Sequence, residues 1–299
     1  MKEAFLGTGV ALITPFTEDL KMDLHALERL INHVIDGGVE YLVVLGTTAE
    51  SATLDPGEKK ELLRFVRDVN RGRLPLVAGI GGNNTRTVAA EMEQADLEGY
   101  QAILSVSPYY NRPTQEGIFR HFQSLSQSSP LPLILYNVPA RTGSNMLPET
   151  VLRLASGSGK ILGIKEASGD MEQIRVLLRD APDGFLVISG DDLNAVPTVL
   201  AGGAGVISVL GQGIPGIFSD MIRLALEGRE AEAFAIHRRI EPLVELIFRE
   251  GNPAGIKVLL QHLGICQKGV RLPLVEASET LTESMGYFLD HQFPVRDFR

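Results

Sequence analysis

One pattern recurs eight times along this sequence and restricts its fold more than any other feature. Each repeat is a short apolar, β-branched run followed by 12 to 17 residues with helical periodicity. Such alternation is typical of βα units around a parallel sheet. Eight strands predict a closed (β/α)8 TIM barrel of the α/β class, and an open doubly wound sheet is the alternative. We predict the strands at residues 9–14, 41–45, 76–79, 102–106, 133–137, 162–165, 186–189 and 205–209.

Helical patterns fill the segments between the predicted strands. The stretches 24–35 and 58–69 carry apolar residues on one face. Four helices have an N-cap candidate with a short polar side chain, namely Asp23, Asp55, Asn84 and Thr114. From about Glu227 onward only helical periodicity continues. The sequence therefore predicts a (β/α)8 catalytic barrel at residues 1–226 and a C-terminal helical appendage at 227–299.

The charge and cysteine content exclude several classes of protein. The chain has 37 acidic and 28 basic residues, a net charge of -9, and no cluster of basic residues offsets it. We therefore expect no nucleic-acid partner and no membrane partner. The single cysteine, Cys266, excludes an intramolecular disulfide and fits a reducing compartment. No signal-peptide pattern is apparent at the start, so we expect a cytoplasmic protein.

An uncharged segment, residues 194–219, has the length of a membrane span. Six glycines and two prolines interrupt it between Pro197 and Gly216. Because these residues break long helices, a short helix, a strand and a loop fit the segment better. We expect no membrane-spanning helix there.

Polar residues follow the apolar runs, at the strand ends where TIM-barrel chemistry takes place. Lys165, directly after the run 161–164, is the most informative of them. A lysine held against a barrel interior loses solvation of its ammonium, its pKa falls, and the free amine becomes a nucleophile toward carbonyl carbon. The ordinary alternative is a lysine that forms an ion pair at a strand end. The polar residues at the other strand ends favour the interpretation of Lys165 as a Schiff-base lysine.

Hydroxyl groups at other strand ends predict a proton relay for such a lysine. Tyr136 precedes Lys165 by one βα unit, and Thr48 also follows a predicted strand. A second tyrosine hydroxyl, from Tyr109 or Tyr110, follows a further predicted strand, residues 102–106. These hydroxyls suit the proton transfers that form and dehydrate a carbinolamine. In the alternative interpretation, Tyr136 is structural, with its ring in the core and its hydroxyl in solvent.

Two groups suit the recognition of carboxylates. Thr47 and Thr48 follow Gly46 at a tight turn, where backbone N–H groups and hydroxyls converge on an anion. Arg141, beyond Pro139, offers a planar fork for bidentate binding. The alternatives are an ordinary threonine-rich turn and a solvated loop arginine. Together the residues describe a keto acid held by its carboxylate, an amine beside it and a second carboxylate held by the arginine.

Other motifs carry less weight. Residues 211–216 match the pattern G-x-G-x-x-G, but no further strand follows to complete a dinucleotide-binding unit, so we interpret them as a turn that opens a helix. The six histidines show no H-x-x-x-H pairing and no acidic or cysteine partner at ligand spacing, so we predict no metal site. We expect Asp191 and Asp192 to begin a helix rather than to form a catalytic pair.

Six segments together resemble the dihydrodipicolinate synthase family, which belongs to the pyruvate-dependent class I lyase superfamily that includes N-acetylneuraminate lyase. The resemblance covers roughly residues 5–265 in the family's order, and the segments are GTTAES (46–51), SPYYNRPTQEG (107–117), YNVPARTG (136–143), GIKEASGD (163–170), ISGDD (188–192) and GVISV (205–209). The resemblance implies a TIM-barrel enzyme that condenses pyruvate with L-aspartate 4-semialdehyde. The implied product is 4-hydroxy-tetrahydrodipicolinate, for diaminopimelate and lysine biosynthesis.

The same resemblance assigns roles to individual residues. It implies that Lys165 forms an imine with pyruvate and that Tyr136 shuttles protons. Thr48 and Tyr110 would complete the relay, with Tyr110 reaching into a neighbouring subunit's site in a homotetramer. The implied substrate contacts are Thr47 and Thr48 with the pyruvate carboxylate, backbone groups of Gly190 and Ile207 with the pocket, and Arg141 with the semialdehyde carboxylate. No cofactor is implied, because the imine is itself the electron sink.

The resemblance also implies an allosteric site for L-lysine at a subunit interface. In lysine-sensitive members it is lined by the positions that correspond to Ser51, Ala52, Pro56, Lys59, Asn83, Thr87 and Tyr109. Pro56 and Lys59 stand where sensitive enzymes often have histidine, and Thr87 replaces an acidic partner for the ligand's ammonium. A cationic ligand would lose an opposite charge and meet a like one. We therefore predict weak or absent inhibition by L-lysine.

Two departures and two alternatives accompany the resemblance. Ala49 stands where glycine is common, and residues 210–213 read Leu-Gly-Gln-Gly where many members have Thr-Ala-Asn. One alternative is an aldolase of the superfamily for N-acetylneuraminate or a 2-keto-3-deoxy sugar acid, which should favour polyol-binding groups over Arg141. The other is a non-catalytic ligand-binding barrel. The joint presence of the lysine, the tyrosines and the threonine argues against a dead site.

Overall fold

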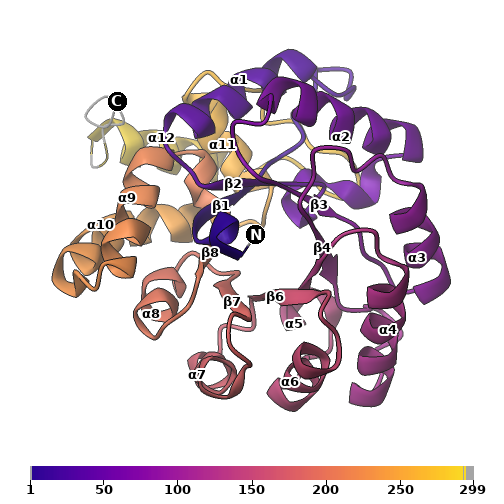
Figure 1. Cartoon of the computed structure of the whole chain (residues 1–299). Coiled ribbons are helices and arrows are strands. Elements are labelled where there is room, and N and C mark those ends of the chain that lie inside the picture. The colour runs from indigo at the N-terminus through magenta and orange to yellow at the C-terminus, as the bar shows by residue number, and fades with distance from the viewer. Residues whose placement is uncertain (1, 292, 294–299) are drawn as a thin grey trace.

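A closed barrel of eight parallel strands forms the centre of the computed structural model, which describes residues 2–291 and 293 (Figure 1). Strands that are consecutive in the sequence are neighbours in the barrel, and β8 closes the ring by pairing with β1. The predicted TIM barrel is confirmed, and the open-sheet alternative is wrong. The strands are β1 (Gly7–Ala11), β2 (Tyr41–Val44), β3 (Leu76–Gly79), β4 (Ala102–Val106), β5 (Leu133–Asn137), β6 (Ile161–Glu166), β7 (Leu186–Ser189) and β8 (Gly205–Ser208).

The predicted strand bounds hold for β3, β4, β5 and β7, and β2 and β6 differ by one residue at their ends. β1 differs most, because it begins at Gly7 and ends at Ala11. The strand pairing of β1 ends before Ile13, because the Ile13 N–H donates a hydrogen bond to Gln212 Oε1 at 3.0 Å instead of to a carbonyl oxygen of the neighbouring strand. β8 ends one residue early for a similar reason, since the Val209 N–H donates to the Asp192 carboxylate.

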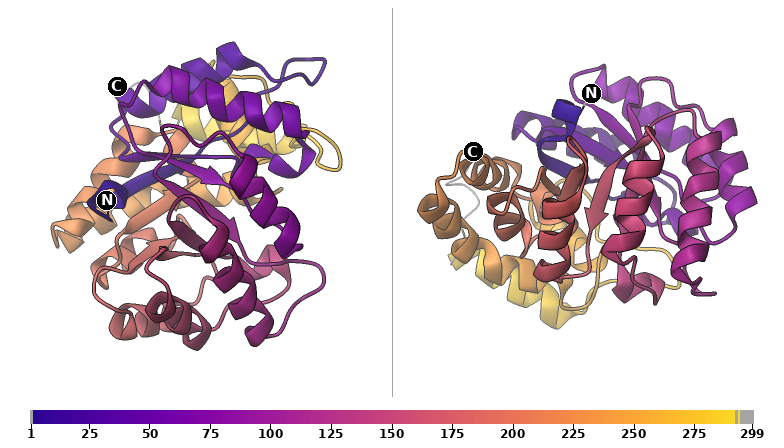
Figure 2. Two further views of the ribbon diagram at one scale, coloured as in Figure 1. Left: turned by 45° about the vertical axis from the view of Figure 1, so that its right-hand side comes forward. Right: turned by 60° about the horizontal axis from the view of Figure 1, so that its bottom comes forward.

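Helices surround the barrel on its outside (Figure 2). The main ones are α1 (Leu24–Asp36), α2 (Pro56–Asn70), α3 (Thr85–Gln94), α4 (Gln115–Ser128), α5 (Pro139–Thr142), α6 (Pro148–Gly157), α7 (Met171–Asp180), α8 (Ala195–Leu200) and α9 (Pro215–Leu226). Four 3-10 helices add to them, namely η1 (Lys2–Phe5), η2 (Thr47–Ala49), η3 (Ser51–Thr53) and η4 (Leu210–Gln212).

The four predicted N-caps are confirmed. The side chains of Asp23, Asp55, Asn84 and Thr114 each accept a hydrogen bond from a backbone N–H in the first helical turn. At α2 the Glu58 side chain also accepts from the Asp55 N–H at 3.0 Å, which completes a capping box. These contacts satisfy N–H groups that have no partner within the helix.

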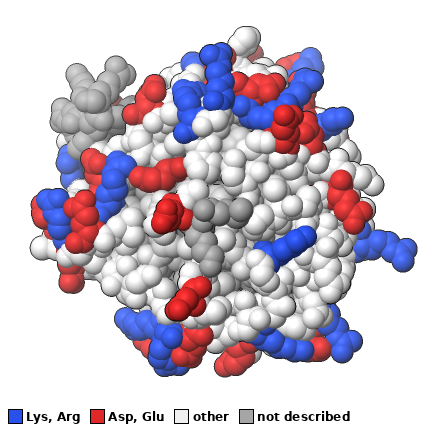
Figure 3. Space-filling view, in the orientation of Figure 1, with Lys and Arg blue, Asp and Glu red and all other residues white. Residues whose placement is uncertain are grey.

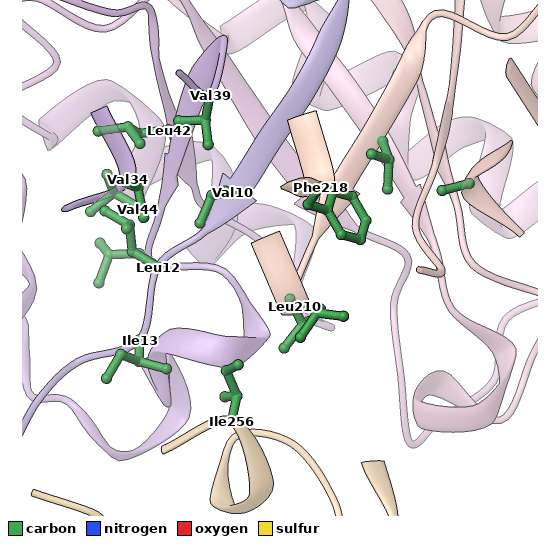
Figure 4. Close-up of a cluster of buried hydrophobic side chains, with 14 of the residues drawn as sticks. Val10, Leu12, Ile13, Val34, Val39, Leu42, Val44, Leu210, Phe218 and Ile256 are labelled. Atoms are coloured by element: carbon green, nitrogen blue, oxygen red, sulfur yellow. The ribbon is translucent and has the colours of Figure 1, made fainter. Parts of the chain in front are cut away.

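Apolar side chains fill two layers because successive strand residues point to opposite faces. On β2, Tyr41 points into the barrel, where its ring lies edge-on to Phe5 of η1 at a centroid distance of 5.4 Å. Leu42, the next residue, joins the layer between strands and helices. Figure 4 shows part of that layer, in which Val10 of β1 and Phe218 of α9 belong to one cluster.

In the described part of the chain, three helices follow α9 and account for the helical pattern predicted after the barrel. They are α10 (Glu230–Phe248), α11 (Ala254–His262) and α12 (Glu279–His291). Ile240, Ile256 and Leu281 from these helices belong to the same apolar cluster as the strands and barrel helices. The proposed boundary after residue 226 coincides with the end of α9, and the division into two units stays a prediction.

The uncharged segment 194–219 folds as α8, β8, η4 and the beginning of α9, as predicted. No helix in the part of the chain that the structure describes combines the length and apolar character that a membrane span requires. On the face shown in Figure 3, lysine and arginine side chains lie mainly around the rim and are interspersed with acidic ones. The expectation that the chain has no nucleic-acid partner stays a prediction.

Candidate active site

A cavity of about 350 Å³ lies at the carboxyl ends of the strands. Six of the eight predicted site residues line it, namely Thr47, Thr48, Tyr136, Arg141, Lys165 and Gly190. Ala140, Ala167, Asp191, Val209 and three residues of α10 complete much of the remaining wall. The structure therefore brings most of the predicted groups to one place, at the end of the barrel where this fold carries its chemistry.

Lys165 points into the barrel from β6 and is buried, with 5% of its surface exposed. Its register partner on β5 is Tyr136, and its Nζ lies 4.5 Å from the centroid of that ring. Among the described residues, none forms an ion pair or a hydrogen bond with the Lys165 ammonium. The strand-end ion pair that the sequence left open is therefore not present within the described part of the chain.

A second buried lysine provides a contrast. Lys257 of α11 is fully buried, and its Nζ lies 2.6 Å from Glu50 Oε1 and 2.7 Å from the Gly269 carbonyl oxygen. Burial lowers the pKa of Lys257, and the Glu50 carboxylate opposes that lowering. Its partners mark Lys257 as a structural lysine. Lys165 instead faces a cavity that can admit a carbonyl compound.

The loop after β2 holds Thr47 and Thr48 in a fixed conformation. Both lie in η2, and Thr14 Oγ1 donates to the Ala49 carbonyl oxygen at 2.7 Å. Ala49 is buried, so its Cβ is accommodated within this turn. The next residue, Glu50, takes a left-handed conformation with φ 55°, which the buried bond to Lys257 helps to maintain.

Arg141 lines the mouth of the cavity from the short helix α5. Its Nη2 donates to the Asn252 carbonyl oxygen at 3.4 Å. No carboxylate pairs with its guanidinium in the described ranges, 2–291 and 293, so the planar fork is available to a ligand. Asp191 and Glu245 are the acidic residues in the cavity wall.

Gly190 packs closely against Ala167 and Lys165 and leaves no room for a side chain of its own. A Cβ at this position would lie 2.6 Å from the Ala167 Cβ and 3.1 Å from the Lys165 Cε. The backbone of Gly190 is fixed as well, because its N–H donates to the Glu166 carbonyl oxygen at 2.7 Å. The missing side chain therefore leaves room beside the Lys165 side chain.

The prediction that Asp191 and Asp192 begin a helix is wrong for both residues. Helix α8 begins at Ala195 after Asn194, and Asp191 accepts from the N–H groups of two intervening residues. Asp192 is buried and accepts from the N–H groups of Val209 and Leu210. Its carboxylate thus joins β7 to the loop after β8, and burial raises its pKa to about 6.

Two predicted site residues do not line the cavity. Ile207 on β8 is buried in the barrel interior, with 1% of its surface exposed. Tyr110 lies on the loop after β4, is 88% exposed and has a φ of 73°. A role for Tyr110 therefore requires a neighbouring subunit, and the roles of Tyr110 and Ile207 stay predictions.

Several residues at the site were not predicted, and some of them come from the C-terminal helical region. Val244, Glu245 and Phe248 of α10 line the cavity, and Asn252 follows that helix. The Asn252 Nδ2 donates to Thr48 Oγ1 at 2.9 Å. The sequence contained one signal, since Lys257 interrupts an apolar run and a lysine in such a run needs a buried partner.

The histidines do not assemble into a metal site. Within the described residues there is no group of three or more histidine, cysteine, aspartate or glutamate side chains that could hold a metal ion. His121, the buried histidine of α4, instead contacts Thr85 Oγ1 through Nδ1 at 2.9 Å. The predicted absence of a cofactor stays a prediction.

Comparison with known proteins relates this architecture to one family. The model of the dihydrodipicolinate synthetase family matches residues 4–292. The chain is 54% identical over 286 residues to 4-hydroxy-tetrahydrodipicolinate synthase of Flavobacterium psychrophilum, covering 96% of this chain and 98% of the relative. The corresponding enzyme of Cytophaga hutchinsonii is 50% identical, with 93% of each chain covered. The crystal structure of dihydrodipicolinate synthase from Thermotoga maritima superposes with a TM-score of 0.94 at 37% identity, covering 97% of this chain and 99% of the other.

Proposed function

The chain belongs to the dihydrodipicolinate synthetase family, and on this basis we propose that it is a 4-hydroxy-tetrahydrodipicolinate synthase. It is a lyase that condenses pyruvate with L-aspartate 4-semialdehyde, and its product enters diaminopimelate and lysine biosynthesis. One observation carries the proposal at the level of chemistry. Lys165 is a buried amine that faces a cavity beside Tyr136 and has no hydrogen-bond or ion-pair partner among the described residues.

The reaction begins at Lys165. Its neutral amine adds to the C2 carbonyl of pyruvate, and the carbinolamine loses water to give an imine. Loss of a proton from the pyruvate methyl group converts the imine to an enamine, because the iminium nitrogen accepts the electron pair. The enamine carbon then attacks the aldehyde carbon of the semialdehyde. Finally the semialdehyde amine attacks C2, closes the ring and releases Lys165, so that one water is formed overall.

Hydroxyl groups carry the protons in this scheme. Tyr136 lies next to the Lys165 ammonium and lines the same cavity as Thr48. The Tyr136 hydroxyl makes no hydrogen bond to another described protein group, so it is available to reacting atoms. General acid–base transfer through Tyr136 and Thr48 supports both the dehydration and the later proton movements.

The two substrates bind at opposite sides of the amine. Thr47 and Thr48 hold the pyruvate carboxylate at the end of β2, and the backbone of Gly190 bounds the pyruvate position on the β7 side. The role of the Ile207 backbone on β8 rests on the family resemblance alone, since Ile207 does not line the cavity. Arg141 binds the carboxylate of the semialdehyde at the mouth of the cavity. No metal or organic cofactor takes part, since the imine supplies the electron sink.

We further propose that the enzyme is a homotetramer located in the cytoplasm. Tyr110 completes the relay in the site of a neighbouring subunit. Tyr110 is 88% exposed in one chain, and its own φ of 73° is costly for a non-glycine residue. Mixing inactive Tyr110→Phe and Lys165→Ala subunits should restore activity, because some sites then combine an intact lysine with an intact tyrosine. Mixed oligomers without activity would contradict the shared site.

A direct assay tests the function. The purified protein is supplied with pyruvate and L-aspartate 4-semialdehyde, and in parallel with N-acetylneuraminate. We expect condensation of pyruvate with the semialdehyde and negligible cleavage of N-acetylneuraminate. The reason is that Arg141 can bind the semialdehyde carboxylate at the mouth of the cavity. Faster turnover of N-acetylneuraminate would support the aldolase alternative, and no turnover of either would support the non-catalytic barrel.

A further inference from the structure

Asn252 lies outside the barrel and contacts two residues on the cavity wall, Thr48 and Arg141. It lies between α10 and α11 and is 8% exposed. Its side-chain Nδ2 donates to Thr48 Oγ1 at 2.9 Å, and its backbone oxygen accepts from Arg141 Nη2 at 3.4 Å. One residue thus touches a group proposed for the pyruvate side and a group proposed for the semialdehyde side.

The direction of the bond to Thr48 has a chemical consequence. A hydroxyl has one proton to donate and two lone pairs to accept with. When the Asn252 amide donates, it occupies a lone pair on Thr48 Oγ1 and leaves the hydroxyl proton for another acceptor. An acceptor at the same place would take that proton out of the relay. The Asn252 Oδ1 has no partner in the described structure, so no other contact of the side chain competes with this bond.

A buried ion pair fixes the distance between Asn252 and Thr48. Glu50 lies two residues after Thr48, and Lys257 lies in α11, the helix that follows Asn252. Their side chains meet at 2.6 Å and are both 0% exposed. The second Glu50 oxygen accepts from the Arg271 N–H at 2.9 Å. A buried pair of this kind resists separation, because either charge left alone would be desolvated without a partner.

We infer that Asn252 is a positioning residue for the reaction: its amide orients the Thr48 hydroxyl so that the Thr48 proton serves the relay around Lys165. This inference rests on the proposed condensation and extends it to the C-terminal helices. Because Asn252 acts through Thr48, removing its side chain should matter only when the Thr48 hydroxyl is present. That dependence separates a positioning role from a general contribution to stability.

A double-mutant cycle with Thr48→Val and Asn252→Ala tests the inference. General acid–base groups contribute roughly 10²-fold or more, so we expect Thr48→Val to lower kcat by about 10²-fold. We expect about tenfold for Asn252→Ala, because the hydroxyl is still present but no longer oriented. The double variant should stay within about twofold of Thr48→Val. Independent roles would instead multiply to about 10³-fold, and that result would overturn the inference.

Asn252→Asp provides a second, nearly isosteric variant. A carboxylate accepts the Thr48 proton, so we expect a loss close to that of Thr48→Val, roughly 10²-fold in kcat. Pyruvate trapping on Lys165 by borohydride should persist in both Asn252 variants, since the nucleophile is unchanged. A kcat within twofold of the wild type in Asn252→Asp would contradict the inference even if the alanine variant failed to fold.

Asn70→Ala is the matched control. Asn70 is a buried amide at the end of α2 whose Nδ2 donates to the Leu74 carbonyl oxygen at 2.8 Å. We expect it to lower the melting temperature without changing kcat. A similar loss of kcat in this control would reduce the Asn252 effect to one of stability. A wild type that does not condense the two substrates would remove the proposed function, and the inference with it, before the cycle is measured.

Discussion

Lys165 and Tyr136 lie opposite each other on adjacent strands, and the Lys165 Nζ is 4.5 Å from the centroid of the tyrosine ring. The residues that follow them, Glu166 and Asn137, are also register partners and are joined by hydrogen bonds of 3.0 Å. These bonds lie in a buried network, where burial raises the pKa of Glu166. The register of β5 and β6 is therefore fixed beside the pair that we assign to imine chemistry.

Tyr136→Phe should separate proton transfer from packing. The variant keeps the ring beside Lys165 and removes the hydroxyl, so we expect kcat to fall by about 10²-fold or more while pyruvate affinity changes little. Steady-state kinetics measures both quantities. Tyr100→Phe is the matched control, because the Tyr100 hydroxyl donates to the Leu63 carbonyl oxygen at 2.9 Å and should contribute to stability only. An unchanged kcat in Tyr136→Phe would return Tyr136 to a structural role.

Arg141→Ala should act on one substrate only. A charge-assisted hydrogen bond to a carboxylate contributes about 1.5 to 3 kcal/mol, which corresponds to roughly 10- to 10²-fold in affinity. We expect the semialdehyde KM to rise by that factor and the trapping of pyruvate on Lys165 to remain. Arg175→Ala on the exposed face of α7 serves as the control. Equal losses toward both substrates would mean that Arg141 supports the fold.

Asp192→Asn should alter how stability depends on pH. Burial raises the Asp192 pKa from 3.8 to about 6, with the Asp191 charge as a smaller cause in the same direction. The folded state therefore binds a proton more readily than the unfolded state. The stabilising contribution is fully present below pH of about 4 and is lost as pH rises through about 6.

The measurement is the difference in unfolding free energy between the wild type and Asp192→Asn, from denaturant titrations at several pH values. Because the other titrating groups are the same in both proteins, their contributions to the pH dependence of stability cancel in this difference. We expect the wild type to lose about 2 kcal/mol relative to the variant between pH 4 and pH 7. A constant difference over that range would show that the Asp192 carboxyl titrates normally in the folded protein.

L-Lysine should inhibit weakly or not at all. Lys59 and Ser51 line a narrow cavity of about 70 Å³, and the Lys59 ammonium lies 3.5 Å from the Glu91 carboxylate. A cationic ligand would meet the Lys59 charge and compete with it for Glu91. We expect half-inhibition above about 1 mM in an activity titration at saturating pyruvate, and stronger inhibition in Lys59→Ala. Submillimolar inhibition of the wild type would contradict the charge argument.

The barrel could be predicted from the sequence because its signals are local. Alternating apolar runs and N-cap residues gave the strand order and the starts of the helices, and Lys165 stood out because it directly follows an apolar run. The end of β1 could not be predicted, since it depends on the Gln212 side chain, 199 residues away, which binds the Ile13 N–H. Asp192 was misjudged for a similar reason, because its partners lie on the loop after β8.

The contribution of the C-terminal helices to the site could not be predicted from the sequence either. Helical periodicity predicts α10 and α11 but does not show which residue between them approaches the strand ends. The contact between Asn252 and Thr48 spans 204 residues, and the Lys257–Glu50 pair spans 207. Such contacts depend on tertiary packing rather than on local pattern. The role that we propose for Tyr110 depends on a further level, the assembly of subunits.

Borohydride trapping tests the central claim most directly. The protein is incubated with pyruvate and borohydride, digested, and analysed by peptide mass spectrometry. We predict one reduced pyruvyl group on the peptide that contains Lys165, and no trapping in Lys165→Ala. Lys160→Ala is the control, because Lys160 lies just before the same strand at the other end of the barrel and should leave trapping intact. A pyruvyl group on another lysine, or none in protein that condenses the two substrates, would contradict the assignment of Lys165 as the nucleophile.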